Sequence, residues 1–154
     1  MGILQRFGDI MKSNINALFD KCEDPAKMVD QTLLDLRKDL ADVKKETASV
    51  MADEKNAKRK LDENDAEIKK YTTAAQNALK SGNEIDAKTL IARKQQLEEI
   101  RTSLQSTYDV AHANAEKMRQ MHDKLTNDIE SMETRKDAIK GKVATAKAQS
   151  HMNK

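Results

Sequence analysis

A hydrophobic heptad repeat runs along most of this chain and constrains its fold more than any other feature. The repeat begins at Val29 and continues to Val143, with one interruption at Ser81-Gly82-Asn83. Apolar residues that alternate every three and four positions form a stripe along a helix, and two such stripes pair in a coiled coil. The repeat therefore predicts an all-α protein, built on a long antiparallel coiled-coil hairpin.

The composition favours the same fold class. Charged residues make up 35% of the chain and aromatic residues 3%, with 4 glycines and 1 proline among 154 residues. Sheet-based folds need more turn residues and more β-branched or aromatic residues than this. Because the apolar residues are also thinly spread, we expect a narrow seam between helices and no wide globular core.

Two short motifs mark where the expected helices begin and end. Asp24-Pro25 is a strong helix start, with Asp as the N-cap and Pro at the first helical position. Gly82 can end a helix in the left-handed conformation, and Asn83 can cap the next one. The expected segments are a short amphipathic helix (1–22), a first hairpin arm (24–81), a second arm (83–150) and a tail (151–154).

Folding the chain about Gly82-Asn83 predicts a register in which the numbers of opposed residues add up to 165. Leu61 then faces Leu104, and Leu40 faces Leu125. Every seam position of one arm meets a seam position of the other, so a single hairpin satisfies both patterns. The predicted seam residues are Leu33, Leu36, Leu40, Leu61, Ile68, Leu97, Leu104, Leu125, Ile129 and Met132.

Several predicted seam positions are polar, among them Glu54, Asn64, Lys94 and Arg101. One interpretation is that these side chains reach out to solvent or set the register. The other is that a partner helix or an assembly contact uses them. His122 also falls on the seam, and we expect it to be partly buried.

The first 22 residues form an amphipathic pattern of their own. At about 100° per residue, the apolar side chains fall in one half of a helical wheel. Arg6 and Lys12 flank this sector, while Asp9 and Asp20 point away from it. Basic residues at the edge of an apolar face are typical of a helix that lies in a membrane interface. The predicted membrane-facing residues are Ile3, Leu4, Arg6, Phe7, Ile10, Met11, Lys12, Ile15, Leu18 and Phe19.

A second interpretation of the N-terminal pattern is that its apolar face packs on the hairpin, near the open end around Val143 and Ala146. The seam between the two arms argues against this interpretation. Because the apolar residues of each arm already pair with those of the other, little apolar surface remains to receive eight more side chains. A membrane helix of this length binds weakly as a single copy, so the membrane interpretation favours a homo-oligomer that presents many copies.

The sequence carries no recognisable catalytic or metal-binding motif, and we expect no enzyme activity, metal or cofactor. The formal net charge is +2 with both signs interspersed, which does not favour nucleic acid as a partner. The lone Cys22 fits a reducing compartment, and no apolar run is long enough to span a bilayer. The sequence therefore favours a cytoplasmic location.

Several stretches resemble the phage-shock protein A family, which includes the vesicle-inducing protein in plastids and is related to the ESCRT-III proteins. They are MGILQRFGDIMKSNINAL, KCEDPAKMVDQ, the Ser-Gly-Asn tip and ARKQQLEEI, while KMRQMHDKL is similar to Firmicute-type members. The resemblance implies a peripheral protein of the envelope stress response at the inner face of the cell membrane. It also implies binding to anionic or stressed bilayers and assembly into rings, rods or helical polymers.

The resemblance leaves a second function open, that of a soluble coiled-coil module that regulates a protein partner such as an AAA+ transcription activator. Members usually continue for some tens of residues beyond this end, so the resemblance implies a C-terminally truncated chain. Some plastid-type members use an arginine of the first arm for nucleotides. The matching residue here is Lys44, which lacks the bidentate fork of arginine, so no nucleotide activity is expected.

Overall fold

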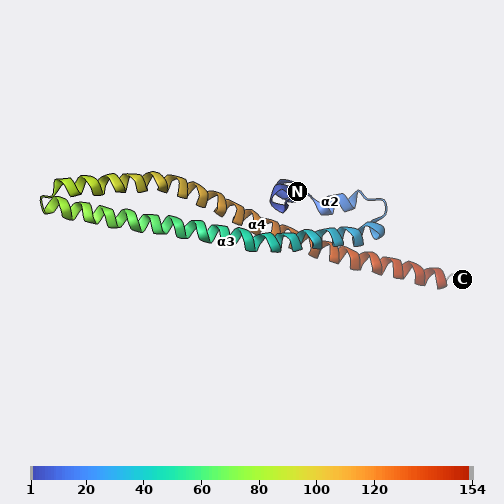
Figure 1. Ribbon diagram of the computed structural model, residues 1–154. Coiled ribbons are helices and arrows are strands. Elements are labelled where there is room, and N and C mark those ends of the chain that lie inside the picture. Colours follow the sequence, from blue (N-terminus) through green and yellow to red (C-terminus); the bar gives the residue numbers. More distant parts are fainter. Residues whose placement is uncertain (1, 153–154) are drawn as a thin grey trace. The chain divides into compact units, whose positions relative to one another are not determined.

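Two long helices joined by a tight turn form an antiparallel hairpin (Figure 1). The computed structural model describes residues 2–152 of the chain, without the side chain of Val143. Helix α3 spans Pro25–Lys80 and helix α4 spans Glu84–Met152. The described residues contain no strand. The predicted all-α class and long hairpin are confirmed. Residue 1 and residues 153–154 of the expected tail lie outside the described part.

The ends of the long helices follow from local chemistry. The carboxylate of Asp24 accepts a hydrogen bond from the Lys27 amide at 3.3 Å, which caps the first turn of α3. Gly82 has φ +79°, a conformation that only glycine adopts at little cost. The amide of Asn83 donates to the Ala78 carbonyl and that of Gly82 to Leu79, which is a Schellman motif.

The start of α4 is capped in the same way as that of α3. The side-chain oxygen of Asn83 accepts a hydrogen bond from the Asp86 amide at 3.2 Å, and its amide group donates to the Asp86 carboxylate at 2.6 Å. Acidic residues in this first turn also complement the positive end of the helix dipole. The chain therefore reverses over three residues and continues as helix on both sides.

The chain divides into two compact units, each containing part of both long helices. The tip unit is residues 48–115, and the terminal unit is residues 1–47 with residues 116–154.

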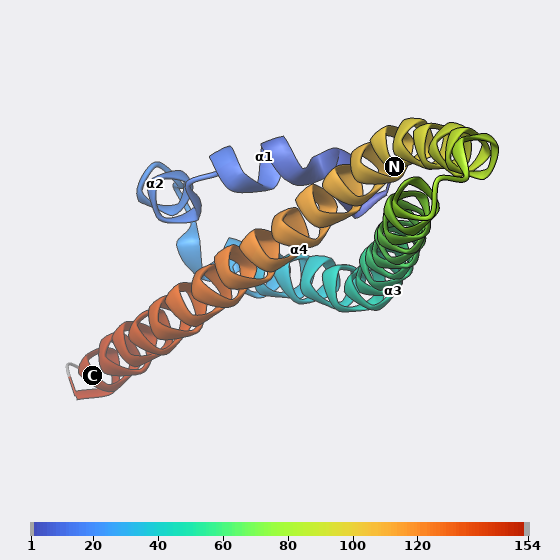
Figure 2. The ribbon, with the colours of Figure 1, turned by 90° about the vertical axis from the view of Figure 1, so that its left-hand side faces the viewer.

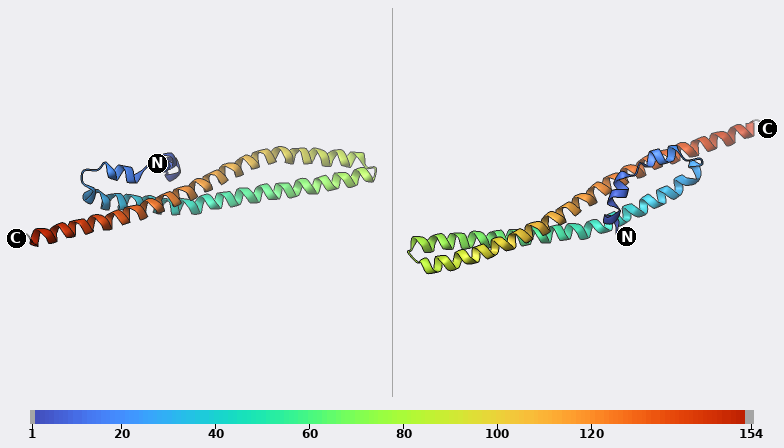
Figure 3. Two further views of the ribbon diagram at one scale, coloured as in Figure 1. Left: turned by 180° about the vertical axis from the view of Figure 1, so that it is seen from behind. Right: turned by 90° about the horizontal axis from the view of Figure 1, so that it is seen from above.

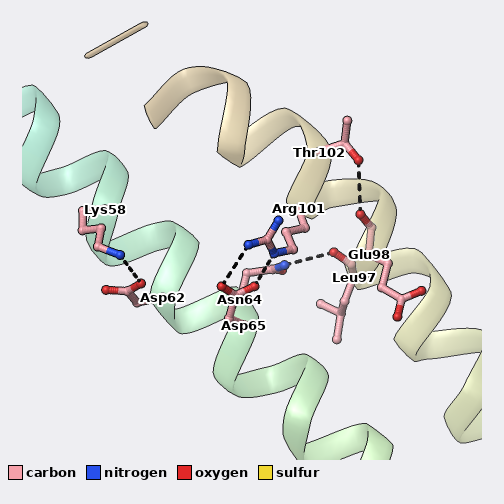
Figure 4. A network of polar contacts seen from close by, with 8 residues as sticks. All are labelled: Lys58, Asp62, Asn64, Asp65, Leu97, Glu98, Arg101 and Thr102. Carbon is pink, nitrogen blue, oxygen red and sulfur yellow. Dashed lines mark hydrogen bonds and ion pairs between the residues drawn. The ribbon is translucent and has the colours of Figure 1, made fainter. Parts of the chain in front are cut away.

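The tip unit has a seam of small and medium side chains, with one buried polar residue. Asn64 is 8% exposed, and its side-chain amide donates to the Leu97 carbonyl at 3.0 Å (Figure 4). Beside it, Arg101 Nε lies 2.6 Å from the Asp65 carboxylate. Hydrogen bonding to Asp65 raises the pKa of Arg101. Asn64 therefore turns inward to a backbone group of the other arm, while Arg101 reaches a carboxylate near the surface.

The terminal unit buries larger side chains. All of the largest fully buried side chains among the described residues belong to it. They are Phe19, Leu33, Val43, Met118, Met121, Leu125 and Met132. The tip unit buries five alanines, which are Ala57, Ala75, Ala87, Ala111 and Ala115, together with Val50, Leu61 and Leu97.

Interhelical ion pairs report the register within each unit. The pairs 65 with 101, 54 with 112 and 30 with 136 each add up to 166, against the predicted 165. A fourth pair, Arg37 with Glu133, reaches further along the helices. The first two lie in the tip unit and the others in the terminal unit. Opposed residues are therefore within one residue of the predicted register at three of four pairs.

Most predicted seam residues are buried, but not all. Leu33, Leu36, Leu61, Leu97, Leu125 and Met132 are buried, and Leu40, Ile68, Leu104 and Ile129 are half-buried. One expectation fails, because His122 is exposed and its ring lies 3.4 Å from the Asp123 carboxylate. Its neighbour Met121 is fully buried instead. The buried face of α4 therefore turns away from a strict heptad in the terminal unit.

Candidate functional site

The N-terminal segment, defined here as residues 3–20, contains three short helices. They are the 3₁₀ helix η1 (Ile3–Arg6), helix α1 (Phe7–Lys12) and helix α2 (Ile15–Asp20). The sequence predicted one continuous helix over residues 1–22, and this prediction is wrong because the segment is broken into three short helices. Ser13 has ψ 137° and Asn14 has ψ 92°, so the chain is extended between α1 and α2.

The break has a local cause. The Asn14 side chain accepts a hydrogen bond from the Ala17 amide at 3.1 Å, so Asn14 acts as the N-cap of α2. The Ser13 hydroxyl donates to the Ile10 carbonyl at 2.8 Å and satisfies an acceptor at the end of α1. Ser and Asn compete well with helical hydrogen bonding, and this pair uses that capacity to start a second helix.

The segment lies beside α3 and α4 within the terminal unit (Figures 2 and 3). Three of its apolar side chains are buried, with Ile3 at 4%, Ile10 at 6% and Phe19 at 2% exposure. The interpretation that the segment packs on the hairpin is therefore correct for these three residues. Its position differs, because the segment contacts Asp39, Lys117 and Arg135, whereas the sequence placed the packing around Val143 and Ala146. The apolar residues of the two arms do pair along the seam, but α4 has a second face, beside the seam, that contacts the segment.

Two ion pairs hold the segment in place. Arg6 makes a fork with Asp39 of α3, with nitrogen-to-oxygen distances of 2.8 and 3.1 Å. This hydrogen bonding raises the pKa of Arg6, against a smaller opposing effect of burial. Arg135 of α4 lies 2.8 Å from the Asp20 carboxylate at the end of α2. The first pair therefore ties the start of the segment to α3, and the second ties its end to α4.

Cations of α4 also cover both phenylalanines of the chain. The Lys117 ammonium lies 5.6 Å from the centre of the Phe7 ring, and the Arg135 guanidinium lies 6.0 Å from that of Phe19. Contacts of this kind are favourable because the ring face carries partial negative charge. Arg135 thus makes both an ion pair and an aromatic contact with α2.

Part of the predicted membrane-facing set stays accessible. Leu18 is 55% exposed, and Lys12 is exposed at the end of α1. The other members, Leu4, Arg6, Phe7, Met11 and Ile15, are half-buried. The hairpin therefore covers the apolar face only in part, with three side chains buried, four apolar ones half-covered and one free.

The heptad pattern did not point to the residues of the hairpin that receive the segment. On α4 the residues with contacts to the segment are Lys117 and Arg135, and the helix between them contains Met121, Lys124 and Asp128 beside the seam. Lys124 and Asp128 pair with each other, and their side chains are only 21% and 13% exposed. Charges on this face hide it from a search for apolar stripes. The low exposure of these charged side chains can be seen in the structure but not in the sequence.

The described residues contain neither a metal-binding cluster nor a membrane-spanning helix. Within residues 2–152, His, Cys, Asp and Glu side chains form no group of three or more that could hold a metal ion. Neither long helix contains a stretch apolar enough to cross a bilayer in this part of the chain. Cys22 is half-buried and lies 2.9 Å from the Met28 sulfur.

Comparisons with a family model and with known proteins point to the same family. The model of the PspA/IM30 family matches residues 2–154. The chain is 51% identical over its whole length to the phage shock protein A homolog of Bacillus subtilis, of which it covers 68%. It is 30% identical over 99% of its length to the membrane-associated protein Vipp1 of Nostoc punctiforme, of which it covers 59%. Protein LiaH of Bacillus subtilis is 24% identical over 98% of the chain, which covers 67% of LiaH.

Proposed function

This chain belongs to the PspA/IM30 family, and from that premise we propose that it is a peripheral membrane-binding protein of the envelope stress response. In this proposal the N-terminal segment inserts its apolar face into an anionic or stressed bilayer. The hairpin assembles copies of the chain into a homo-oligomer that stabilises or remodels the membrane. The protein acts from the cytoplasmic face of the cell membrane and performs no enzymatic step.

The amphipathic N-terminal segment is the observation that carries this proposal. Its eight apolar side chains share one half of a helical wheel, and the hairpin buries only three of them. Leu18 is free to meet a bilayer first, and Lys12 is exposed beside the apolar sector. A lysine at that edge can reach lipid phosphates while the apolar side chains enter the acyl boundary.

The energetics favour many copies acting together. Fully burying one large apolar side chain gains about 1.5–3 kcal/mol, but interfacial burial is partial. A helix of fewer than about 15–20 residues is also marginal in water, so ordering it on a membrane costs free energy. One segment should therefore bind weakly and reversibly. Several segments on one scaffold bind more tightly through their effective concentration.

The names of the relatives support the membrane part of the proposal. The Vipp1 proteins of Nostoc punctiforme and of Synechocystis are described as membrane-associated. The chain spans 68% of the phage shock protein A homolog of Bacillus subtilis, 59% of Vipp1 of Nostoc punctiforme and 57% of Vipp1 of Synechocystis, so the activity of a complete member is part of the proposal.

Flotation with anionic vesicles tests the proposal. We expect the wild-type chain to float with the vesicles and Phe7→Glu to remain in solution, because the new carboxylate lies in the centre of the apolar face. Gln5→Glu is the matched control, since it adds the same charge at an exposed position about 160° away from Phe7 on the wheel. It should float nearly as well as wild type. A wild-type chain that stays in solution at low salt would contradict the proposal and favour a soluble coiled-coil regulatory module.

A further inference from the structure

We infer that the hairpin face around Asp39, Lys117 and Arg135 is an intramolecular binding site for the N-terminal segment, and that it competes with the membrane for the same side chains. The inference rests on the proposed function, because it concerns how membrane binding is regulated. Nothing in the heptad pattern requires such a site, since the seam between α3 and α4 already buries most of the predicted core.

The competition follows from which side chains the site covers. Ile3, Ile10 and Phe19 are almost fully buried in the docked segment, and all three belong to the apolar face that a membrane would bind. Phe7 lies under the Lys117 ammonium, so its ring also has a partner in the hairpin. A side chain cannot contact the hairpin and the acyl chains at once. Docking and insertion therefore exclude each other.

The shape of the docked segment gives the same conclusion. Helices α1 and α2 have six residues each, and helices this short do not persist alone in water. Their docking contacts hold them, with the extended backbone at Ser13 and Asn14 between them. Lying flat in an interface as one helix would require both residues to become helical. That change breaks the Asn14 cap and turns α2 relative to α1.

The charges of the site explain how it can release the segment. One partner of each ion pair is accessible to solvent, because the Arg6 side chain is 40% and the Asp20 side chain 66% exposed, while Asp39 and Arg135 are partly covered. Exposed pairs contribute little each and are weakened by salt. A membrane that offers phosphates to Arg6 replaces Asp39 as its partner. The docked state is therefore stable enough to form and weak enough to be displaced.

A simple linkage describes the consequence. If only the undocked fraction binds the membrane, the apparent dissociation constant equals the intrinsic one divided by that fraction. A substitution that weakens docking then tightens membrane binding, although it touches no lipid contact. This outcome separates the site from a structural role, since a merely damaged hairpin would not bind vesicles more strongly.

Two substitutions of opposite charge test the inference by vesicle titration. Asp39→Asn removes an acid and releases Arg6, and Arg135→Gln removes a base and releases Asp20 and Phe19. Simple attraction to anionic lipid predicts tighter binding for the first and weaker binding for the second. The binding site predicts tighter binding for both, by about three- to tenfold.

Each variant has a matched control on its own helix. Asp35→Asn removes the same charge from α3, but the Asp35 carboxylate accepts only from Gln31, one turn away. Arg119→Gln removes the same charge from α4, where Arg119 pairs with Glu116 of its own helix. These controls report the purely electrostatic effect. The Arg135 variant should bind more tightly than wild type, while the Arg119 variant binds equally or more weakly.

Hydrogen exchange in the absence of vesicles provides a second readout. Amides of residues 7–20 should exchange more slowly in wild type than in Asp39→Asn or Arg135→Gln, because docking protects short helices. Amides of α3 and α4 in the tip unit should stay equally protected, which shows that the hairpin is folded. Unchanged exchange at residues 7–20 in both variants would overturn the inference.

The outcomes distinguish the inference from the proposed function. If wild type floats, Phe7→Glu does not, and the two docking variants match their controls, the membrane proposal holds and the competing site is contradicted. If the docking variants bind more tightly and adding Phe7→Glu abolishes this gain, both hold. If no variant binds anionic vesicles at low salt, both are overturned, since a released segment should bind best.

Discussion

The two units of the hairpin differ in what covers the outer face of their helices. In the tip unit two helices meet alone, and their buried seam combines five alanines with Val50, Leu61, Leu97 and one asparagine. In the terminal unit a third layer, the N-terminal segment, packs on the pair, and the buried side chains are leucine, methionine and phenylalanine. Small side chains suit a narrow two-helix seam, whereas a third layer gives large side chains room to be covered.

The difference teaches where each kind of stability comes from. Apolar side chains that remain exposed in the tip unit include Met51, Ile85 and Val110, at 60%, 80% and 61%. The terminal unit covers Met121 fully on a comparable outer position of α4. We therefore expect the terminal unit to depend on large buried side chains, and the tip unit on register and turn geometry. The following substitutions probe that contrast.

The largest effect should come from a buried methionine of the terminal unit. Met121→Ala should lower the free energy of unfolding by about 2–4 kcal/mol, because it removes a fully covered side chain and leaves a cavity. The matched control is Met51→Ala in the tip unit, which should change it by less than about 0.5 kcal/mol. Urea unfolding measures both. Equal losses at the two positions would remove the distinction between the units.

The buried amide of the tip unit should give the next effect. Asn64→Ala loses the hydrogen bond to the Leu97 carbonyl, and we expect a loss of about 1–2 kcal/mol. Asn64→Leu should recover that stability while loosening the register, because a lone buried asparagine can fix helix alignment. Cysteines at positions 61 and 104 report the register by cross-linking, with Cys22 replaced by serine. A leucine variant that cross-links as selectively as wild type would contradict this role.

Alanine substitutions at two glycines should change the free energy of unfolding in opposite directions. Gly82→Ala should destabilise by about 1–2 kcal/mol because φ is positive there, although no atom lies within 4 Å of the added Cβ. Gly141→Ala in α4 meets equally open space in a helix, so it should stabilise by about 0.5–1 kcal/mol. Thermal unfolding checks both signs. A neutral Gly82 variant would mean that the turn relaxes away from the Schellman geometry.

The smallest effect concerns the pH dependence of the terminal unit. The hydrogen bond from Lys136 lowers the pKa of Asp30 below its ordinary value of 3.8. A lowered folded-state pKa means that this pair stabilises the fold above the ordinary pKa and is lost as the pH falls through the lowered one. Asp30→Asn should therefore flatten the acid side of the stability curve slightly. An unchanged curve would show that the exposed pair contributes nothing.

Much of the fold could be predicted from particular residues. Gly82 and Asn83 specify the turn because glycine allows positive φ and asparagine caps a helix, and Asp24 with Pro25 specifies the start of α3. The leucine seam then predicts a register that three of the four interhelical ion pairs match within one residue. These features are local or strictly periodic, which is why sequence reasoning reaches them.

The docking of the N-terminal segment could not be predicted in the same way. Its contacts on α4 come from Lys117 and Arg135, which a hydrophobic pattern classifies as solvent-facing charges. The buried Met121 lies between them, one position before the predicted seam residue His122. Ser13 and Asn14 did offer a signal, because this pair is a good N-cap. The sequence does not show whether this cap or a continuous amphipathic helix prevails, because the outcome depends on tertiary contacts.

A single tryptophan tests the central claim most directly, namely that the N-terminal segment is the part that enters the membrane. The chain contains no tryptophan, so Phe7→Trp places a unique reporter on the apolar face. With anionic vesicles we predict a blue-shifted emission that lipids brominated in their acyl chains quench strongly, while Gln5→Trp on the opposite face is quenched little. Equal quenching at both positions, or no quenching of Phe7→Trp in protein that floats with the vesicles, would contradict the account.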